Sequence, residues 1–393
     1  MAKKSAIIGL MISAIAAAVP GTLRAQDGVT PTSIKIGMFG PLTGPASLWG
    51  YPTQAGAIMI YKDINDKGGI HGRKIEVVQE DGACDAAKTI AAVKKLIHRE
   101  KVFMINSGIC SGPTLAAKEE IVSNKVPLML FAASLDAITA PANPYVYTVA
   151  PTGSFDGKSM AEFAKSIPGT KKVALIGHAD EWAQSKIKPF LAVMKDAGIE
   201  VVANETIDRK VVDATAQVLA LKRRSPDVVA LFTYPAESAA IVRDAFKYGL
   251  KVNFVGNNGL IDLPALAERA GNIQAVQTTY VMSAIVGSVG SPQLEPYEKL
   301  LTKYFPDEKV KADSFYGSAS AITIVEALKR AGPDLTREKF IEALNQLRGF
   351  DPGIAPCKVT FTPEDHQGCQ SQTAWKLVGN KVVTVGPVWR EVK

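Results

Sequence analysis

The chain has 393 residues, which is enough for two domains of ordinary size. Its formal net charge is +7 at neutral pH, but the basic residues are interleaved with acidic ones, as where Arg73 and Lys74 precede Glu76 and Glu80. Because it lacks a basic stripe with aromatic residues between the charges, we predict no binding of nucleic acid.

The first 25 residues have the features of a secretory signal peptide. Lys3 and Lys4 give a positive start, and the apolar stretch Ala6–Val19 is too short to span a bilayer comfortably. Small residues lead up to Ala25, so we expect cleavage near Ala25 and exclude residues 1–25 from the fold. No later segment has about 18 uninterrupted apolar residues. We therefore predict an exported protein.

The mature chain begins with a βαβ unit. A buried strand, Ile34–Phe39, runs into a loop of Gly, Pro, Thr and Ser, then a helix, a turn at Lys67–Arg73 and a second strand, Ile75–Glu80. Such loops at the carboxyl ends of strands bind ligands in open α/β sheets. This loop has neither a G-x-G-x-x-G nor a Walker A pattern. The unit therefore favours a small-molecule cleft without nucleotide chemistry, and we expect no cofactor.

Short apolar strands alternate with helices as far as about Val281. The first series has strands at Val102–Ser107 and Val126–Phe131 and helices near Ala86–Arg99 and Thr114–Asn124. The second series has strands at Val173–Gly177, Val201–Asn204, Val228–Thr233 and Phe254–Asn257, and helices near Trp182–Ala197, Ala214–Arg223 and Ala236–Tyr248. Strands that are apolar on both faces are typical of parallel sheets covered by helices. Two such series predict two doubly wound α/β lobes.

The pattern changes after Val281. Helices are predicted near Gln293–Tyr304, Ser314–Ala331 and Arg337–Gln346, followed by a hairpin with strands at Lys358–Phe361 and Thr373–Val378 around the turn Pro363–Gly368. No low-complexity linker separates the lobes, so we expect a cleft that closes on short hinge strands.

The four cysteines fall into two groups, Cys84 with Cys110 and Cys357 with Cys369. An even count in an exported protein favours disulfides, and we prefer pairing within each group among the three possible connectivities. A zinc site is the alternative, but no C-x-x-C or H-x-x-x-H accompanies the cysteines. We predict no metal site.

The segment Gly108–Gly112 has the shape of a nucleophile elbow with Cys110 at its centre. Oxidation of Cys110 would leave no thiolate for catalysis. His178 ends a strand and is the only histidine expected near a cleft, although we expect it to be structural. His71, His98 and His366 are expected at the surface. An exported hydrolase is therefore a weak alternative.

Two serines follow strands of the first series. Ser111 begins a helix with Pro113 in its first turn, where free backbone N–H groups suit a carboxylate. The alternative, that Ser111 only caps its helix, is about equally supported by the local sequence. Ser134 would donate to the same anion, and the carbonyl of Ala132 would accept a hydrogen bond.

Three large aromatic residues, Trp49, Trp182 and Tyr234, lie in loops that follow strands. Aromatic walls with a few polar groups are typical of sites for apolar organic ligands.

The segments Ile34–Pro45, Ile64–Arg73, Glu80–Asp85 and Cys110–Ser111 resemble those of the leucine/isoleucine/valine-binding family, the periplasmic substrate-binding proteins of branched-chain amino-acid-type ABC transporters. The resemblance implies the type I periplasmic binding fold, in which three crossovers join two lobes around a cleft, and a disulfide between Cys84 and Cys110. We place the crossovers near Val149–Thr152, Tyr280–Ser283 and Gly368–Thr373. One lobe would comprise residues 33–150 and 283–368, and the other residues 151–281 and 371–393.

The resemblance also implies ligand contacts. The ligand carboxylate would be held by Ser111 and Ser134, and its ammonium in part by the carbonyl of Ala132. The pocket would be lined by Trp49, Trp182 and Tyr234, where two of the three are more usually tyrosines.

One position departs from the family. Amino-acid-binding relatives have an acidic residue, paired with the ligand ammonium, where this chain has Asn258. Loss of one partner of a buried charge pair costs about 3–5 kcal/mol, or two to three decades or more in affinity. We therefore predict a carboxylate without an α-amino group, either aromatic or a 2-oxo acid. A hydrophobic amino acid is the alternative if Asp180, Glu181 or Glu237 supplies the charge.

The resemblance implies a non-enzymatic receptor in the periplasm of an ABC importer. The receptor would close on a small carboxylate and present it to a membrane permease. We expect a monomer. The alternative role is a ligand-sensing module for a signalling partner.

Overall fold

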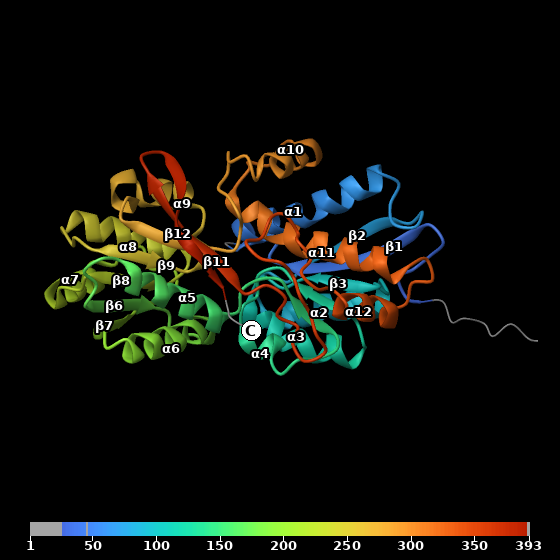
Figure 1. Cartoon of the computed structure of the whole chain (residues 1–393), viewed down its shortest axis with the longest axis horizontal. Helices are drawn as coiled ribbons and strands as arrows, with labels where there is room; N and C mark the ends of the chain where they lie inside the picture. Colours follow the sequence, from blue (N-terminus) through green and yellow to red (C-terminus); the bar gives the residue numbers. More distant parts are fainter. Residues whose placement is uncertain (1–25, 45, 391–393) are drawn as a thin grey trace, which may run out of the picture.

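The structure is a computed structural model that describes residues 26–44 and 46–390. The predicted signal peptide lies outside these residues. Two α/β lobes lie side by side along the long axis of the molecule, which confirms the predicted architecture (Figure 1). Within the described part of the chain, no helix has both the length and the apolar composition needed to cross a membrane.

The first lobe contains a five-stranded parallel sheet in the order β2-β1-β3-β4-β5. Its strands are β1 (Ser33–Gly40), β2 (Lys74–Asp81), β3 (Met104–Ser107), β4 (Leu128–Leu130) and β5 (Val146–Thr148). Its helices are α1 (Ser47–Asp66), α2 (Ala86–Lys94) with the π turn η1 (Lys95–Arg99), α3 (Ser111–Ser123), α4 (Asp136–Thr139), α10 (Glu295–Tyr304), the 3-10 turn η4 (Ala312–Phe315), α11 (Tyr316–Ala331) and α12 (Arg337–Asn345). Helices α1 and α11 pack together on one face, and α2 and α3 on the other.

The second lobe contains a seven-stranded sheet in the order β12-β11-β10-β9-β8-β6-β7. Five strands are parallel: β6 (Lys172–Gly177), β7 (Glu200–Thr206), β8 (Val228–Phe232), β9 (Asn253–Gly256) and β10 (Thr279–Ser283). Its helices are α5 (Gly153–Ser166), α6 (Glu181–Asp196), α7 (Thr215–Arg224), α8 (Pro235–Lys247) and α9 (Leu263–Ala270), with the 3-10 turns η2 (Asn258–Leu260) and η3 (Ile273–Val276). Helices α5 and α6 pack together on one face, while α8 and α9 pack together elsewhere on the lobe.

The predicted hairpin at Lys358–Phe361 is wrong. The hairpin pairs β11 (Ser371–Val378) with β12 (Lys381–Arg390) across Gly379 and Asn380, so this sheet is mixed and not wholly parallel. Gly379 has a φ of 58°, and Gly-Asn between two strand patterns is a two-residue turn signal. Val359 and Phe361 are apolar because they are buried in the first lobe, where Val359 forms only an isolated antiparallel bridge with Phe350.

His366 is likewise not at the surface. The loop that contains it lies against β5, because the backbone N–H of Thr148 donates to the His366 carbonyl at 2.9 Å. The imidazole is buried and stacks on Tyr147, with ring centroids 4.0 Å apart. Burial lowers the pKa of His366.

The chain passes between the two sheets three times: between β5 and α5, after β10, and just before β11. The first and third passages are linked by the Gln370 side chain, which accepts from the backbone N–H of Thr152 at 2.9 Å and donates to the carbonyl of Ala150 at 3.3 Å. That these passages act as hinges between lobes with the predicted boundaries stays a prediction.

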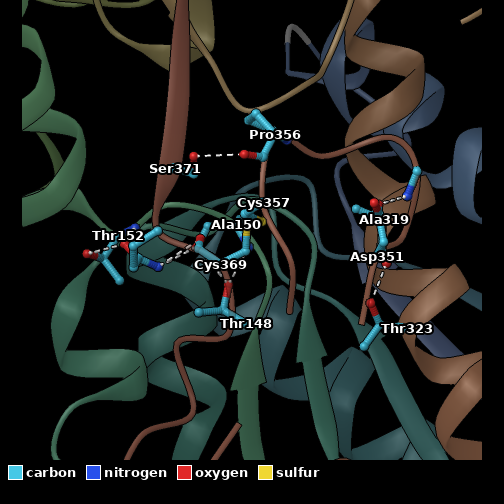
Figure 2. The surroundings of a disulfide bond; sticks show 12 residues. Thr148, Ala150, Thr152, Ala319, Thr323, Asp351, Pro356, Cys357, Cys369 and Ser371 are labelled. Carbon is cyan, nitrogen blue, oxygen red and sulfur yellow. Dashed lines mark hydrogen bonds between the residues drawn. A yellow bond between two sulfur atoms is a disulfide. The ribbon is translucent and has the colours of Figure 1, made fainter. Parts of the chain in front are cut away.

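Both preferred disulfide pairings are confirmed, Cys84 with Cys110 and Cys357 with Cys369. The second one ties the third passage to the loop that precedes it, beside a hydrogen bond from Ser371 to the Pro356 carbonyl (Figure 2).

Two glycines allow α1 to approach η4 and α11 closely. A Cβ added at Gly56 would lie 1.6 Å from the carbonyl oxygen of Ser314, and one added at Gly317 would lie 2.2 Å from the carbonyl oxygen of Thr53. This contact fixes the start of α1, which carries Trp49, relative to Asp313 in η4.

Replacing Gly56 with alanine should therefore destabilise the protein by about 3 kcal/mol, because backbone must move to relieve the overlap. Gly112→Ala is the matched control, since Gly112 is also helical and an added Cβ there would contact nothing within 4 Å. Urea denaturation of both variants tests this contact. Equal stabilities of the two variants would contradict it.

Candidate functional site

The predicted ligand-binding residues all follow the carboxyl ends of strands. In the first lobe they lie after β1, β3 and β4, and in the second lobe after β6, β8 and β9. In chain order they are Trp49, Ser111, Ala132, Ser134, Trp182, Tyr234 and Asn258. Parallel strands bring such residues to one edge of each sheet.

Ser111 and Ser134 are in direct contact and buried. The backbone N–H of Ser134 donates to Ser111 Oγ at 3.0 Å. Ser111 is the first residue of α3, and the position before it, Cys110, makes no side-chain cap. Ser111 Oγ therefore accepts a hydrogen bond from outside its helix, and its contact with a ligand stays a prediction. Nearby, the Ala132 N–H donates to the carbonyl of Gly108 at 3.1 Å.

A buried lysine that was not predicted joins this pair from the other lobe. Lys186 of α6 has a side chain with 0% exposure, and its Nζ donates to Ser134 Oγ at 2.8 Å. Nζ also lies 4.8 Å from the centroid of the Trp182 ring. Since α6 belongs to the second lobe and Ser134 to the first, this hydrogen bond crosses between the lobes.

The counterion of Lys186 is Asp156 of α5. The two charged groups are 3.6 Å apart, too far for a hydrogen bond, and both side chains are fully buried. Asp156 Oδ1 accepts from Gln372 Nε2 at 2.8 Å, whereas Oδ2 has no hydrogen-bond partner. Burial raises the pKa of Asp156 and lowers the pKa of Lys186, and their mutual attraction opposes both shifts.

The close approach of α5 and α6 makes this ion pair possible. A Cβ added at Gly157 would lie 2.1 Å from the carbonyl oxygen of Lys186. The sequence pattern indicates that Lys186 is buried, because Lys186 shares a helix face with the buried residues Ala183, Ile187 and Phe190. A lysine on an apolar stripe needs a buried partner, but the sequence did not say which residue this is.

The aromatic residues form two separate groups. In the second lobe Trp182 and Tyr234 stack with ring centroids 4.3 Å apart. Tyr234 also accepts from Arg209 Nη2 at 3.2 Å, and burial raises its pKa to about 12. In the first lobe Trp49 contacts Tyr316 edge-on at 6.3 Å.

Asn258 lies between the Lys186–Asp156 ion pair and the aromatic pair of Tyr316 and Trp49. Its backbone N–H is directed toward Asp156 without reaching hydrogen-bonding geometry, and its carbonyl accepts from the Tyr316 hydroxyl at 2.5 Å. A chain of contacts therefore leads from Ser111 and Ser134 through Lys186 and Asp156 to Asn258, Tyr316 and Trp49.

The acids considered as substitutes for a charge at Asn258 have other partners. Asp180 accepts from Arg209 Nε at 3.0 Å, and Glu181 is exposed. Glu237 Oε1 accepts from the Lys210 N–H at 2.6 Å, whereas Glu237 Oε2 is buried without a hydrogen-bond partner, 3.9 Å from His178 Nε2. The hydrolase alternative loses its nucleophile, because Cys110 is in a disulfide. His178 is buried, with Nδ1 at 2.9 Å from the Ile207 carbonyl.

A second acid, the half-buried Asp313, lies beside Trp49. The indole N–H is directed toward the carboxyl group without reaching hydrogen-bonding geometry, so Trp49 Nε1 and Asp313 Oδ1 are both buried without a hydrogen-bond partner. Burial, followed by the negative charge of Asp262, raises the pKa of Asp313 to about 7, and Lys311 and Arg269 only partly offset this.

The lobes are closed around these residues. A cavity of about 10 Å³, with room for about one water molecule, lies in the first lobe beside the passages; its lining includes Phe131, Tyr316 and Ile285. A larger groove of about 520 Å³ lies between α9, η3 and the end of β11, and none of the predicted ligand-binding residues lines it. That the ligand binds between the lobes, at the residues described above, stays a prediction.

Comparison with known proteins gives matches along most of the chain. Residues 33–378 match the family model described as periplasmic binding protein. The Leu/Ile/Val-binding protein homolog 7 of Brucella abortus is 28% identical over 339 residues, which cover 83% of this chain and 81% of that protein.

Two solved structures illustrate the shared fold. A fatty acid ABC transporter substrate-binding protein from Thermomonospora curvata has a TM-score of 0.82 at 23% identity, covering 95% of this chain and 96% of that one. An ABC transporter solute binding protein from R. palustris in complex with 4-hydroxybenzoate has a TM-score of 0.79 at 21% identity, covering 91% and 97%.

The Lys186–Asp156 pair gives a stability prediction. Lys186→Met and Asp156→Asn should each destabilise the protein by about 3 kcal/mol, because each leaves a buried charge without its partner. The double variant should lose clearly less than the sum of the two. Urea denaturation of all three variants gives the coupling energy, with Lys188→Met, an exposed lysine on the same helix, as control. Additive losses would contradict the pairing.

Asp313 gives a pH prediction. Its pKa is raised from 3.8 to about 7, so the folded protein favours the protonated acid. The stability contributed by this group is present at low pH and is lost as the pH rises through 7. The free energy of unfolding of the wild type, minus that of Asp313→Asn, should therefore fall between about pH 4 and 8. Asp334→Asn is the control, since the Asp334 side chain is 91% exposed, and a flat difference for Asp313→Asn would refute the assignment.

Proposed function

The chain belongs to the periplasmic binding protein family, and we propose that it is the receptor for a small carboxylate without an α-amino group. It is a substrate-binding protein of the ABC transporter type and has the type I periplasmic binding fold. The chain would close on its ligand and deliver it to a membrane permease, as predicted from the sequence.

The observation that supports this ligand class best is the buried ammonium group of Lys186. It donates to the Ser134 hydroxyl, and the Ser134 backbone N–H donates to Ser111 Oγ at the start of α3. Ser111, Ser134 and the first N–H groups of α3 form the predicted carboxylate site, and Lys186 adds a full positive charge to it. A carboxylate bound there would be neutralised by the protein itself.

An α-amino acid fits this arrangement less well. Its ammonium would lie near Lys186, with Asn258 neutral and Asp156 as the single buried carboxylate in this chain of contacts. Two like charges about 4 Å apart cost about 4 kcal/mol at an effective dielectric constant of 20. A hydrophobic amino acid is the second candidate, since Asp156 Oδ2 has no hydrogen-bond partner. Its ammonium would have to displace Lys186 from Asp156.

The comparisons are compatible with both candidates. The similar proteins are named as a Leu/Ile/Val-binding protein homolog, a fatty acid transporter substrate-binding protein and a solute binding protein in complex with 4-hydroxybenzoate. All of these ligands carry a carboxylate, and only the first group carries an α-amino group. The Trp182–Tyr234 stack and the Trp49–Tyr316 pair offer aromatic surface for an apolar ligand body.

The test compares matched ligands on protein from which any bound ligand has been removed by unfolding and refolding. The series are phenylalanine, phenylpyruvate and 3-phenylpropionate, and leucine and 4-methyl-2-oxopentanoate. The acids without an amino group should raise the unfolding temperature, because binding to the folded state stabilises it. If leucine or phenylalanine binds more tightly than its non-amino partner in calorimetry, the proposed ligand class is wrong.

The role of Lys186 is tested in the same assay. Lys186→Met should weaken carboxylate binding by about a hundredfold or more, the effect of removing a buried charged partner. Lys188→Met should leave binding unchanged. Circular dichroism confirms that each variant is folded, and the double variant with Asp156→Asn provides a neutral site if Lys186→Met is unstable. Unchanged affinity in both Lys186 variants would contradict the proposal.

A further inference from the structure

Trp49 and Asp313 leave an unused donor and an unused acceptor side by side in the first lobe. Trp49 Nε1 and Asp313 Oδ1 are buried, and neither makes a hydrogen bond. A polar group that is kept from water without a partner lowers the stability of the fold. The carbonyl of Asp313 is engaged, since it accepts from Thr53 Oγ1 at 3.2 Å. The backbone of Asp313 is therefore held in place while its carboxyl group is not.

Nothing near Asp313 neutralises its carboxyl group fully. Lys311 and Arg269 act on it only at a distance, without forming an ion pair, and Asp262 adds a like charge. The raised pKa agrees with an acid held in an unfavourable place, which is common at binding sites. The α1–η4 contact at Gly56 fixes this place relative to Trp49.

Trp49 and Asp313 are linked to the proposed carboxylate site by a chain of contacts, but they are not part of that site. Trp49 contacts Tyr316, and the Tyr316 hydroxyl donates to the Asn258 carbonyl. The Asn258 N–H is directed toward Asp156, the partner of Lys186, without a hydrogen bond. A ligand whose carboxylate lies at Ser111 and Ser134 would have its other end directed along this chain of contacts. Trp49 and Asp313 would meet that other end.

The two groups together specify the chemistry of what they bind. The indole N–H only donates, and an ionised carboxylate only accepts. A carbonyl oxygen would satisfy Trp49 alone, an ammonium group would satisfy Asp313 alone, and a second carboxylate would be repelled. A hydroxyl group accepts from one and donates to the other.

We infer that Trp49 and Asp313 form a hydroxyl-binding subsite, so that the ligand is a carboxylate with a hydroxyl group at its far end. The inference rests on the proposed function for the position of the carboxylate. It narrows the ligand class to hydroxylated acids, of which hydroxyaryl acids also use the aromatic surfaces of the cleft.

The experiment measures the ratio of affinities within pairs that differ only in the hydroxyl group. The pairs are 4-hydroxybenzoate and benzoate, 4-hydroxyphenylacetate and phenylacetate, 3-(4-hydroxyphenyl)propionate and 3-phenylpropionate, 5-hydroxypentanoate and pentanoate, and tyrosine and phenylalanine. Calorimetry at pH 8, where Asp313 is largely ionised, gives each dissociation constant. In at least one pair the hydroxylated member should bind about tenfold or more tightly, the effect of one buried hydrogen bond to a charged group.

Variants assign that preference to the subsite. Trp49→Phe keeps a ring but removes the N–H, and should bring the ratio to within about threefold of one. Asp313→Leu should do the same. Trp182→Phe is the matched control, which changes the aromatic surface of the other lobe and should lower both affinities without changing their ratio.

The outcomes separate this inference from the proposed function. If acids without an amino group bind but no pair shows a preference, or the preference survives in Trp49→Phe and Asp313→Leu, the hydroxyl subsite is wrong and the proposed function stands. If only tyrosine and phenylalanine bind and the ratio depends on Trp49, the proposed ligand class fails while the subsite stands. If no member of any pair binds, the hydroxyl subsite is overturned, and binding of phenylpyruvate or 4-methyl-2-oxopentanoate decides the proposed function separately.

Discussion

The fully buried ammonium group of Lys186 is the interaction on which the site depends. A lysine without exposure requires a counterion and hydrogen-bond acceptors, and here these come from both lobes: Asp156 from α5, and Ser134 from the loop after β4. The hydrogen bond to Ser134 exists only while the lobes are together. Closure of the cleft and the electrostatics of the site are therefore parts of one arrangement, and a ligand that enters must compensate the charge that opening exposes.

The two lobes supply different parts of this arrangement. The first lobe supplies hydroxyl groups, helix N–H groups and Trp49, on a parallel sheet whose carboxyl edge faces the other lobe. The second supplies the charges and the Trp182–Tyr234 stack. Close helix contacts fix the position of each part. Gly56 allows the contact between α1 and η4, and Gly157 allows the contact between α5 and α6. A family with a common fold can in this way change its ligand by changing a few side chains at two fixed edges.

The sequence predicted what depends on local pattern. Most strands of the two sheets, the positions of Ser111 and Trp182 at strand ends, and both disulfide pairings followed from periodicity, spacing and family resemblance. It did not predict the Lys186–Asp156 pair, because tertiary packing of α5 on α6 brings the two residues together. The buried position of His366 and the β11–β12 hairpin were missed because apolar residues such as Val359 also occur in buried loops.

The most direct test identifies the small molecule that the protein binds in its own cell. Protein purified without refolding is denatured, and the compounds released are identified by mass spectrometry and quantified against the protein. The account predicts a carboxylic acid without an amino group, present in about one copy per chain. Recovery of leucine, valine or another α-amino acid in that amount would contradict the role assigned to Lys186 and Asn258.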